Sequence, residues 1–283
     1  MSMGFKIFSS TRVALIFVLM LLSHWVSAET TEDQTLVFGV VPQQASEKLA
    51  QQWLPVAQYL SERIGQPVRF ATAPNIPEFE KRLSTGEYDL AYMNPYHFTV
   101  FNREPGYQAL ARQRGHQIRG IIVVSSDLKI ESLEQLAGAS IAFPAPNAFA
   151  ATLVTRAFLD RDVPDYRADF VRSHDSVYRN VAEGLFDAGG GILRTLDNMP
   201  PEIRKKLEIL WLSPGFTGHA IAAHPRVSET VRSTVRDTLI SFDESDQGRA
   251  ILNELNMTGF QKAEDSDWDD VRALGIKTLR VAQ

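Results

Sequence analysis

The stretch Tyr88-Asp89-Leu90-Ala91-Tyr92-Met93-Asn94-Pro95-Tyr96-His97-Phe98 decides how this chain is expected to fold. Its first half is aromatic and apolar apart from one aspartate, which predicts a strand over 88–93. Asn94 and Pro95 then suit the N-cap and the first turn of a helix. A strand that ends where a helix begins is the repeating unit of α/β proteins.

This junction is also a candidate ligand site. The free amide groups and the positive dipole end of a helix start favour an anion, and open α/β sheets bind ligands beyond the carboxyl ends of their strands. Tyr92, Asn94, Tyr96 and His97 are therefore candidate wall residues. The alternative is a buried aromatic cluster that only closes the strand.

The rest of the chain alternates apolar segments with amphipathic ones, which predicts an α/β protein with mainly parallel sheets. The predicted strands cover 36–41, 68–71, 88–93, 118–125, 140–143, 169–171, 207–212 and 218–223. The main predicted helices cover 46–64, 147–159, 174–183, 227–239, 248–256 and 268–280. Ser46 is expected to cap the first of these, and Asn75 to cap a short helix that ends near Gly86.

Two further helix starts carry candidate ligand contacts. Asn147, Ala148, Phe149 and Ala150 follow a strand and two prolines, and the amide groups of Ala148 to Ala150 are expected to hold an oxyanion. A plain strand-to-helix loop is the alternative. The triplet Gly189-Gly190-Gly191 lacks the spacing of a nucleotide-binding loop, so it is expected to let the backbone approach a ligand or a packed helix.

The second helix start contains His174 and Asp175, and Gln43 and Gln44 follow the first strand. An acid in a first turn ordinarily complements the helix dipole. A carboxylate that faces an oxyanion instead requires a proton or an ammonium group between them, and His174 is able to neutralise the pair. The two glutamines offer neutral donors, with ordinary surface positions as the alternative.

The first 28 residues are expected to form a cleavable secretory signal. Lys6 and Arg12 precede an apolar run from Val13 to Leu22, and Val26-Ser27-Ala28 is a small-x-small cleavage site. The apolar run is shorter than the roughly 20 residues that span a bilayer. We therefore expect a mature chain that is soluble in the periplasm and has no lipid anchor.

Composition excludes several functions. The chain has no cysteine, which rules out disulfides, thiolate metal sites and thiol catalysis. Its formal net charge of −5 argues against nucleic-acid binding. The histidines show no metal-ligand spacing and there is no G-x-S-x-G elbow. We expect no cofactor, no metal and no catalytic residue.

Several ordered motifs resemble the phosphate/phosphite/phosphonate family of ABC-transporter solute-binding proteins. With Gly86-Glu87 before it, the opening stretch is similar to the family segment G-x-Y-D-L-A-Y-x-N-P-Y. The other matching segments are Val40–Gln44, Phe143–Asn147, Ser173–Val177, Val181–Gly189 and Gly218–Ala222. The resemblance covers the chain from about residue 36 to its end.

The resemblance implies a two-lobe periplasmic binding protein of type II. Residues 29–120 and 215–283 would form lobe 1, residues 121–214 would form lobe 2, and hinge closure would trap a small oxyanion such as phosphonate or phosphite for a membrane permease. The resemblance also places an acid at Asp175 facing the ligand. Phosphonate binders typically carry Ser and Thr where this chain has Ala-Phe-Ala, which favours a smaller or differently substituted ligand.

Two other functions fit the same fold. The closed form of a monomeric binding protein could act as the input to a membrane-bound sensor kinase or cyclase, and a permease or sensor gene nearby would separate these functions. An enzyme on this fold is the third alternative, against which the signal sequence and the missing cofactor motifs argue.

The cleavage site generates the first prediction. Expression of the full chain in a Gram-negative host is expected to yield a periplasmic protein that begins at Glu29, because Val26-Ser27-Ala28 directly precedes it. N-terminal sequencing of the periplasmic extract checks this. Recovery only from membranes with Met1 intact would contradict it.

Overall fold

The computed structural model describes residues 1, 3–4 and 35–277. The chain divides into Met1–Gln34 and Thr35–Gln283, and everything below concerns the second unit. The expected apolar core and cleavage site of the signal lie outside the described residues. None of the described helices is both long enough and apolar enough to cross a membrane.

The first sheet has six strands in the order β13-β4-β12-β3-β1-β2. Strand β1 pairs in parallel with β2 and β3, whereas β12 pairs antiparallel with β3 and β4, and β13 pairs antiparallel with β4. The strands are β1 (Leu36–Val40), β2 (Val68–Ala71), β3 (Leu90–Met93), β4 (Gln108–Gln113), β12 (Ala220–Ala223) and β13 (Phe260–Lys262).

The second sheet has five strands in the order β10-β6-β9-β7-β8, and β5 and β11 form a separate pair. Strand β7 runs parallel to β8 and β9, while β6 runs antiparallel to β9 and β10. The strands are β5 (Gln117–Ile118), β6 (Gly120–Ser125), β7 (Ser140–Phe143), β8 (Arg167–Phe170), β9 (Ala188–Ile192), β10 (Leu207–Leu212) and β11 (Phe216–Thr217).

Both sheets are mixed, which corrects the expectation of mainly parallel sheets. Parallel neighbours need a crossover connection such as a helix, and β1, β2 and β3 are linked in this way. Strands β6 and β12 are instead the first strands after the chain crosses from one sheet to the other through β5 and β11. Both pair antiparallel with their neighbours. Four strands were not predicted from the sequence: β4, β9, β11 and β13. The predicted lobe boundaries near 120 and 215 stay a prediction.

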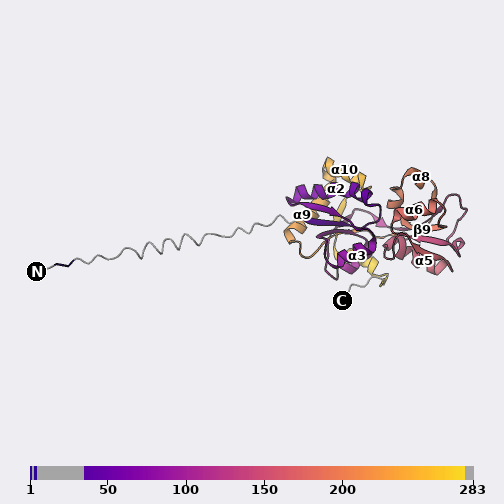
Figure 1. Ribbon diagram of the computed structural model, residues 1–283, viewed down its shortest axis with the longest axis horizontal. Helices are drawn as coiled ribbons and strands as arrows, with labels where there is room; N and C mark the ends of the chain where they lie inside the picture. The colour runs from indigo at the N-terminus through magenta and orange to yellow at the C-terminus, as the bar shows by residue number, and fades with distance from the viewer. Residues whose placement is uncertain (2, 5–34, 278–283) are drawn as a thin grey trace. The chain divides into compact units, whose positions relative to one another are not determined.

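The longer helices follow the predicted pattern closely. Figure 1 shows α2, α9 and α10 around the first sheet, and α5, α6 and α8 around the second. The helices are α2 (Ser46–Ile64), α3 (Ile76–Ser84), α4 (Pro95–Phe101), α5 (Thr155–Asp162), α6 (His174–Ala182), α7 (Leu193–Asp197), α8 (Pro201–Arg204), α9 (Glu229–Ile240), α10 (Asp246–Glu254) and α11 (Asp269–Arg272), with short turns η1 (Leu133–Leu136), η2 (Phe149–Val154), η3 (Phe242–Glu244) and η4 (Asp265–Trp268).

The caps explain where several helices begin. The Asn75 side chain accepts a hydrogen bond from the Glu78 amide and the Asn94 side chain accepts one from the His97 amide, so both predicted caps are confirmed. Ser46 does not cap α2, because Ala45 occupies that position. The helix predicted over 147–159 starts as the wide π-type turn η2 and continues as α5.

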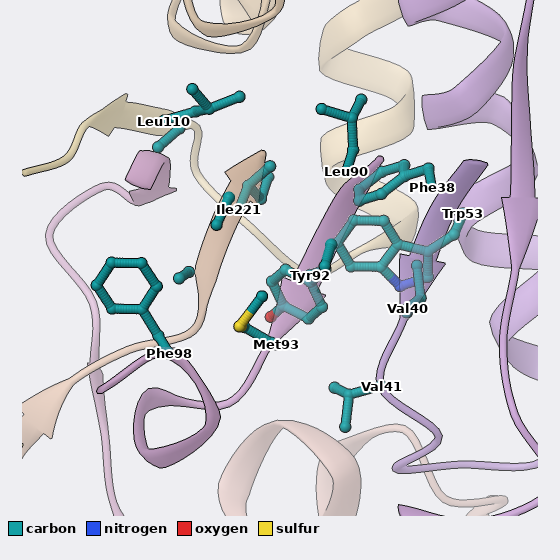
Figure 2. Packing of buried hydrophobic residues seen from close by; sticks show 14 of the residues in the cluster. Phe38, Val40, Val41, Trp53, Leu90, Tyr92, Met93, Phe98, Leu110 and Ile221 are labelled. Atoms are coloured by element: carbon teal, nitrogen blue, oxygen red, sulfur yellow. The ribbon is translucent and has the colours of Figure 1, made fainter. Parts of the chain in front are cut away.

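An aromatic group lies at the centre of the first sheet's core. Figure 2 shows Trp53 of α2 beside Phe38 and Tyr92. The centroid of the Trp53 ring lies 5.7 Å from the centroid of the Phe38 ring, with the two rings edge-on, and 4.3 Å from that of the Tyr92 ring. Such pairs contribute about 0.5–1.5 kcal/mol each beyond the area they bury. This packing holds β1, β3 and α2 together. It therefore also fixes the positions of the loops that follow β1 and β3.

The glycine triplet forms the middle of β9, which lies between α6 and η2. A Cβ atom at Gly191 would lie 2.2 Å from the Tyr178 hydroxyl, and one at Gly190 would lie 2.1 Å from the Ala151 carbonyl oxygen. The absence of side chains lets the backbone of η2 pack directly on the strand. The triplet therefore serves helix packing, one of its two expected roles.

Gly190→Ala is expected to lower the free energy of unfolding by about 1–3 kcal/mol, because the added methyl group collides with backbone atoms of η2. Gly218→Ala is the matched control, since its Cβ would have no neighbour closer than 3.8 Å. Urea unfolding of both variants measures the difference. Equal midpoints for the two variants would contradict the packing role.

Candidate ligand-binding site

The ends of strands from both sheets meet at one place. Gln43 follows β1, Asn94 follows β3, and η2 follows β7 after a short loop. Asn94 Nδ2 donates a hydrogen bond to the Asn147 carbonyl oxygen at 3.1 Å, and the His174 amide donates to the Gln43 carbonyl oxygen at 3.0 Å. The carboxyl ends of strands thus converge, as the sequence analysis predicted for ligand sites of α/β proteins.

A pocket at this meeting point, here called the amide pocket, contains about 170 Å³ of unoccupied space, part of which is open to solvent. Six residues named by the sequence analysis line it: Gln43, Asn94, Ala148, Phe149, Ala150 and His174. Ile118, Ala151 and Ile192 complete its wall. The wall therefore combines loops that follow strands of the first sheet with the start of η2 and the start of α6.

Three amide groups at the start of η2 have no hydrogen-bond acceptor among the described residues: those of Phe149, Ala150 and Ala151. We expected the amides of Ala148, Phe149 and Ala150. The Ala148 amide instead donates to the Ala145 carbonyl oxygen at 3.2 Å, because residues 145–148 form a turn before the helix. The free amides are therefore shifted by one residue, and they suit an oxyanion.

His174 supplies the second polar feature of the amide pocket. Its side chain is 1% exposed, its Nδ1 lies 3.1 Å from Thr195 Oγ1, and its Nε2 has no hydrogen-bond partner in the described structure. Burial, together with the positive charge of Arg194, lowers the pKa of His174 to about 3. The imidazole is therefore neutral at physiological pH and offers a free ring nitrogen to the pocket.

Asp175 of α6 makes a contact that was not predicted from the sequence, and its role facing the ligand stays a prediction. It is not part of the wall of the amide pocket, and its Oδ2 accepts a hydrogen bond from the Ala45 amide at 3.0 Å. A carboxylate at the start of α2 complements the dipole of that helix. The geometry thus gives Asp175 a contact between α6 and the loop after β1.

The remaining candidates of the opening stretch point in different directions. His97 is fully buried, and its Nε2 lies 2.9 Å from Glu80 Oε1. Tyr96 faces a separate hollow near α11. Successive helical residues are rotated by about 100°, so Tyr96 and His97 project from different sides of α4. For these two residues the structure favours the buried-cluster alternative.

Asn147 and Gln44 are also placed outside the walls of the amide pocket. The Asn147 side chain donates to Glu80 Oε2 at 3.2 Å, which ties the loop before η2 to α3. Gln44 is 7% exposed and follows Gln43 in the same loop. Both residues shape the loops around the pocket. Glu80 was not foreseen, because a single glutamate in a helix carries no local sign of burial.

Tyr92 lines a second pocket, here called the arginine pocket, which contains about 370 Å³ of unoccupied space and opens to solvent. Arg194 and His219 line the same pocket, and neither was among the predicted site residues. Arg194 directly follows the β9–α7 junction. The strand-end rule that singled out Asn94 did not reach it, because β9 was not predicted as a strand.

Buried His174 generates a pH prediction. Its pKa is about 3 in the folded chain and about 6.5 when unfolded. Between these values the unfolded state binds more protons, so stability falls as the pH drops through this window. His174→Gln is expected to flatten the pH dependence of the unfolding free energy by about 1.4 kcal/mol per pH unit between roughly pH 6 and 4.

Urea unfolding at several pH values measures this slope. Thr195→Val is the matched control, because it removes the partner of His174 Nδ1 and keeps the titrating group. The control is expected to retain the wild-type slope. A wild-type slope in His174→Gln would show that His174 does not titrate in this window.

Comparison with known proteins identifies the family and the fold of the chain. The family model described as ABC transporter, phosphonate, periplasmic substrate-binding protein matches residues 38–268. The phosphonates-binding periplasmic protein of Escherichia coli (strain K12) is 24% identical over 289 residues, which cover 97% of this chain and 85% of that protein.

Two solved structures show the same fold. A Prochlorococcus marinus (MIT 9301) protein in complex with methylphosphonate has a TM-score of 0.80 and 20% identity, with 86% of this chain and 97% of that chain covered. The binding-protein component of a Pseudomonas aeruginosa phosphonate ABC transporter has a TM-score of 0.79 and 19% identity, with 85% of each chain covered. The expected two-lobe type II periplasmic binding protein fold is confirmed. Since the family model spans residues 38–268, the chain belongs to the family of periplasmic substrate-binding proteins of phosphonate ABC transporters.

Proposed function

We propose that this protein captures a phosphonate in the amide pocket and delivers it, in the periplasm, to the permease of an ABC importer. The observation that supports this most directly is the combination of three free amides with the unpartnered Nε2 of His174 in one wall. The protein performs no chemistry on the ligand in this proposal.

The amides of Phe149, Ala150 and Ala151 would bind the phosphonate oxygens, helped by the positive end of the η2–α5 helix. Neutral His174 would donate one hydrogen bond to the ligand and would not neutralise its negative charge. Asn94 and Gln43 close the pocket from the side of the first sheet. These contacts need no hydroxyl side chain, so the Ala-Phe-Ala sequence is compatible with binding an oxyanion.

Closure of the two lobes over the ligand would use the contacts already described. The His174 amide donates to the Gln43 carbonyl oxygen, and Asp175 accepts from the Ala45 amide. Both bonds join α6 to the loop after β1, directly beside the pocket. Lobe movement would therefore open the pocket and break these bonds together, which is the hinge mechanism of this fold class.

Binding of methylphosphonate to the mature protein is the direct test. Calorimetry is expected to show binding of methylphosphonate and none of sulfate at the same concentration. His174→Leu is expected to weaken methylphosphonate binding by about tenfold, because it removes one hydrogen bond to a charged group. His224→Leu is the matched control, since His224 lies outside the amide pocket.

Thermal unfolding provides an independent readout. Ligand at about 100 times its Kd stabilises the folded state by roughly 2.7 kcal/mol. Failure of methylphosphonate, phosphite and phosphate alike to bind or stabilise the wild-type protein would overturn the proposed function.

A further inference from the structure

Arg194 is a cation without a counter-charge. Its Nη2 donates to Gln43 Oε1 at 2.9 Å, and its guanidinium carbon lies 5.5 Å from the centroid of the Tyr92 ring. Among the described residues no carboxylate lies within salt-bridge distance of it, whereas twelve other lysines and arginines form such pairs. A half-buried guanidinium of this kind is suited to an anionic ligand.

Arg194 shares the arginine pocket with one further cation, Arg119, and with two histidines. Arg119, His116 and His219 line the arginine pocket with it, and no acidic residue contributes to that wall. Two acids of neighbouring elements pair with other cations: Asp197 of α7 with Arg204 at 3.8 Å, and Asp267 with Arg112 of β4 at 3.5 Å. The pocket therefore carries a positive potential that nothing in its own wall neutralises.

His219, which also lines this pocket, has a ring nitrogen without a hydrogen-bond partner among the described residues. Its ring stacks on Tyr92 with centroids 4.9 Å apart and planes inclined by 13°. The residue is 6% exposed, and its Nε2 makes no hydrogen bond in the described structure. Burial, and then the charge of Arg194, hold the pKa of His219 well below its usual range. A buried polar atom without a partner costs free energy unless a ligand pairs with it.

The two pockets adjoin, because Ile118 and Ile192 belong to the walls of both. Gln43 joins them as well, since it lines the amide pocket and accepts a bond from Arg194. A ligand whose head occupies the amide pocket would thus direct its substituent past two apolar side chains toward Arg194 and His219.

We propose that the preferred ligand is a phosphonate that carries a second acidic group, such as a carboxylate, on a short chain. The phosphonate would lie at the amides of η2, and the carboxylate would lie against Arg194 and His219. This inference rests on the proposed function of the amide pocket. An ammonium substituent in the same place would be repelled by Arg194, and the amine preference first inferred from Asp175 has no carboxylate in either wall to support it.

Calorimetry with three probes of similar size tests this proposal: phosphonoacetate, ethylphosphonate and 2-aminoethylphosphonate. The wild-type protein is expected to bind phosphonoacetate about tenfold more tightly than ethylphosphonate, because a charge-assisted pair is added. It is expected to bind 2-aminoethylphosphonate most weakly of the three.

Three variants locate the effect. Arg194→Met is expected to abolish the preference for phosphonoacetate and to change ethylphosphonate binding by no more than about threefold, while Arg194→Lys keeps part of the preference. His219→Phe preserves the stacking on Tyr92 and should reduce the preference. Arg167→Met is the charge-matched control, because Arg167 is exposed and pairs with Asp169 on the edge strand β8.

The outcomes separate the two proposals. Binding of ethylphosphonate with no advantage for phosphonoacetate, or tightest binding of 2-aminoethylphosphonate, would overturn this inference and leave the proposed function intact. Binding of none of the probes would overturn the proposed function itself. Should Arg194→Met fail to fold, an undiminished preference in His219→Phe and Arg194→Lys would still count against the proposal.

Discussion

The hydrogen bond from the His174 amide to the Gln43 carbonyl oxygen is the contact on which the site depends. It joins the first turn of α6, which belongs to the second sheet, to the loop after β1 of the first sheet. Both residues of this bond line the amide pocket. A second bond, from the Ala45 amide to Asp175, joins the same helix to the same loop. A site shared by two sheets exists only while such bonds hold.

The chemistry of the site comes mainly from backbone groups. The amides at the start of η2 are free because a helix start leaves its first N–H groups without partners, and because the turn at 145–148 uses only one of them. Small side chains at 148, 150 and 151 keep these amides accessible. This helix start thus lines the amide pocket with backbone amides and with no hydroxyl side chain.

Electrostatics divides the site into two regions. Histidines 174 and 219 stay neutral because burial and the charge of Arg194 both oppose their protonation. The permanent positive charge of the arginine pocket therefore resides on Arg194 and Arg119. A ligand with two negative groups would pair with both the free amides and the guanidinium of Arg194. A phosphonate with an amino group would pair with the amides alone.

Local signals in the sequence were sufficient for much of this. The caps at Asn75 and Asn94, the alternation of strands and helices, and the ordered family motifs all depend on neighbouring residues, and the structure and the family match agree with them. Six of the predicted site residues line the amide pocket for the same reason: each follows a strand or starts a helix.

Tertiary structure decided the rest, because the deciding contacts join residues far apart in the chain. Glu80 meets His97 and Asn147, Asp175 meets Ala45, and Arg194 meets Gln43 and Tyr92. No local pattern shows which way a side chain in α4 or α6 points once two sheets pack together. The sequence by itself determined the fold class, the family and the helix start that offers its amides. Only the packing of the sheets decided which side chains face the ligand and where the unpaired positive charge lies.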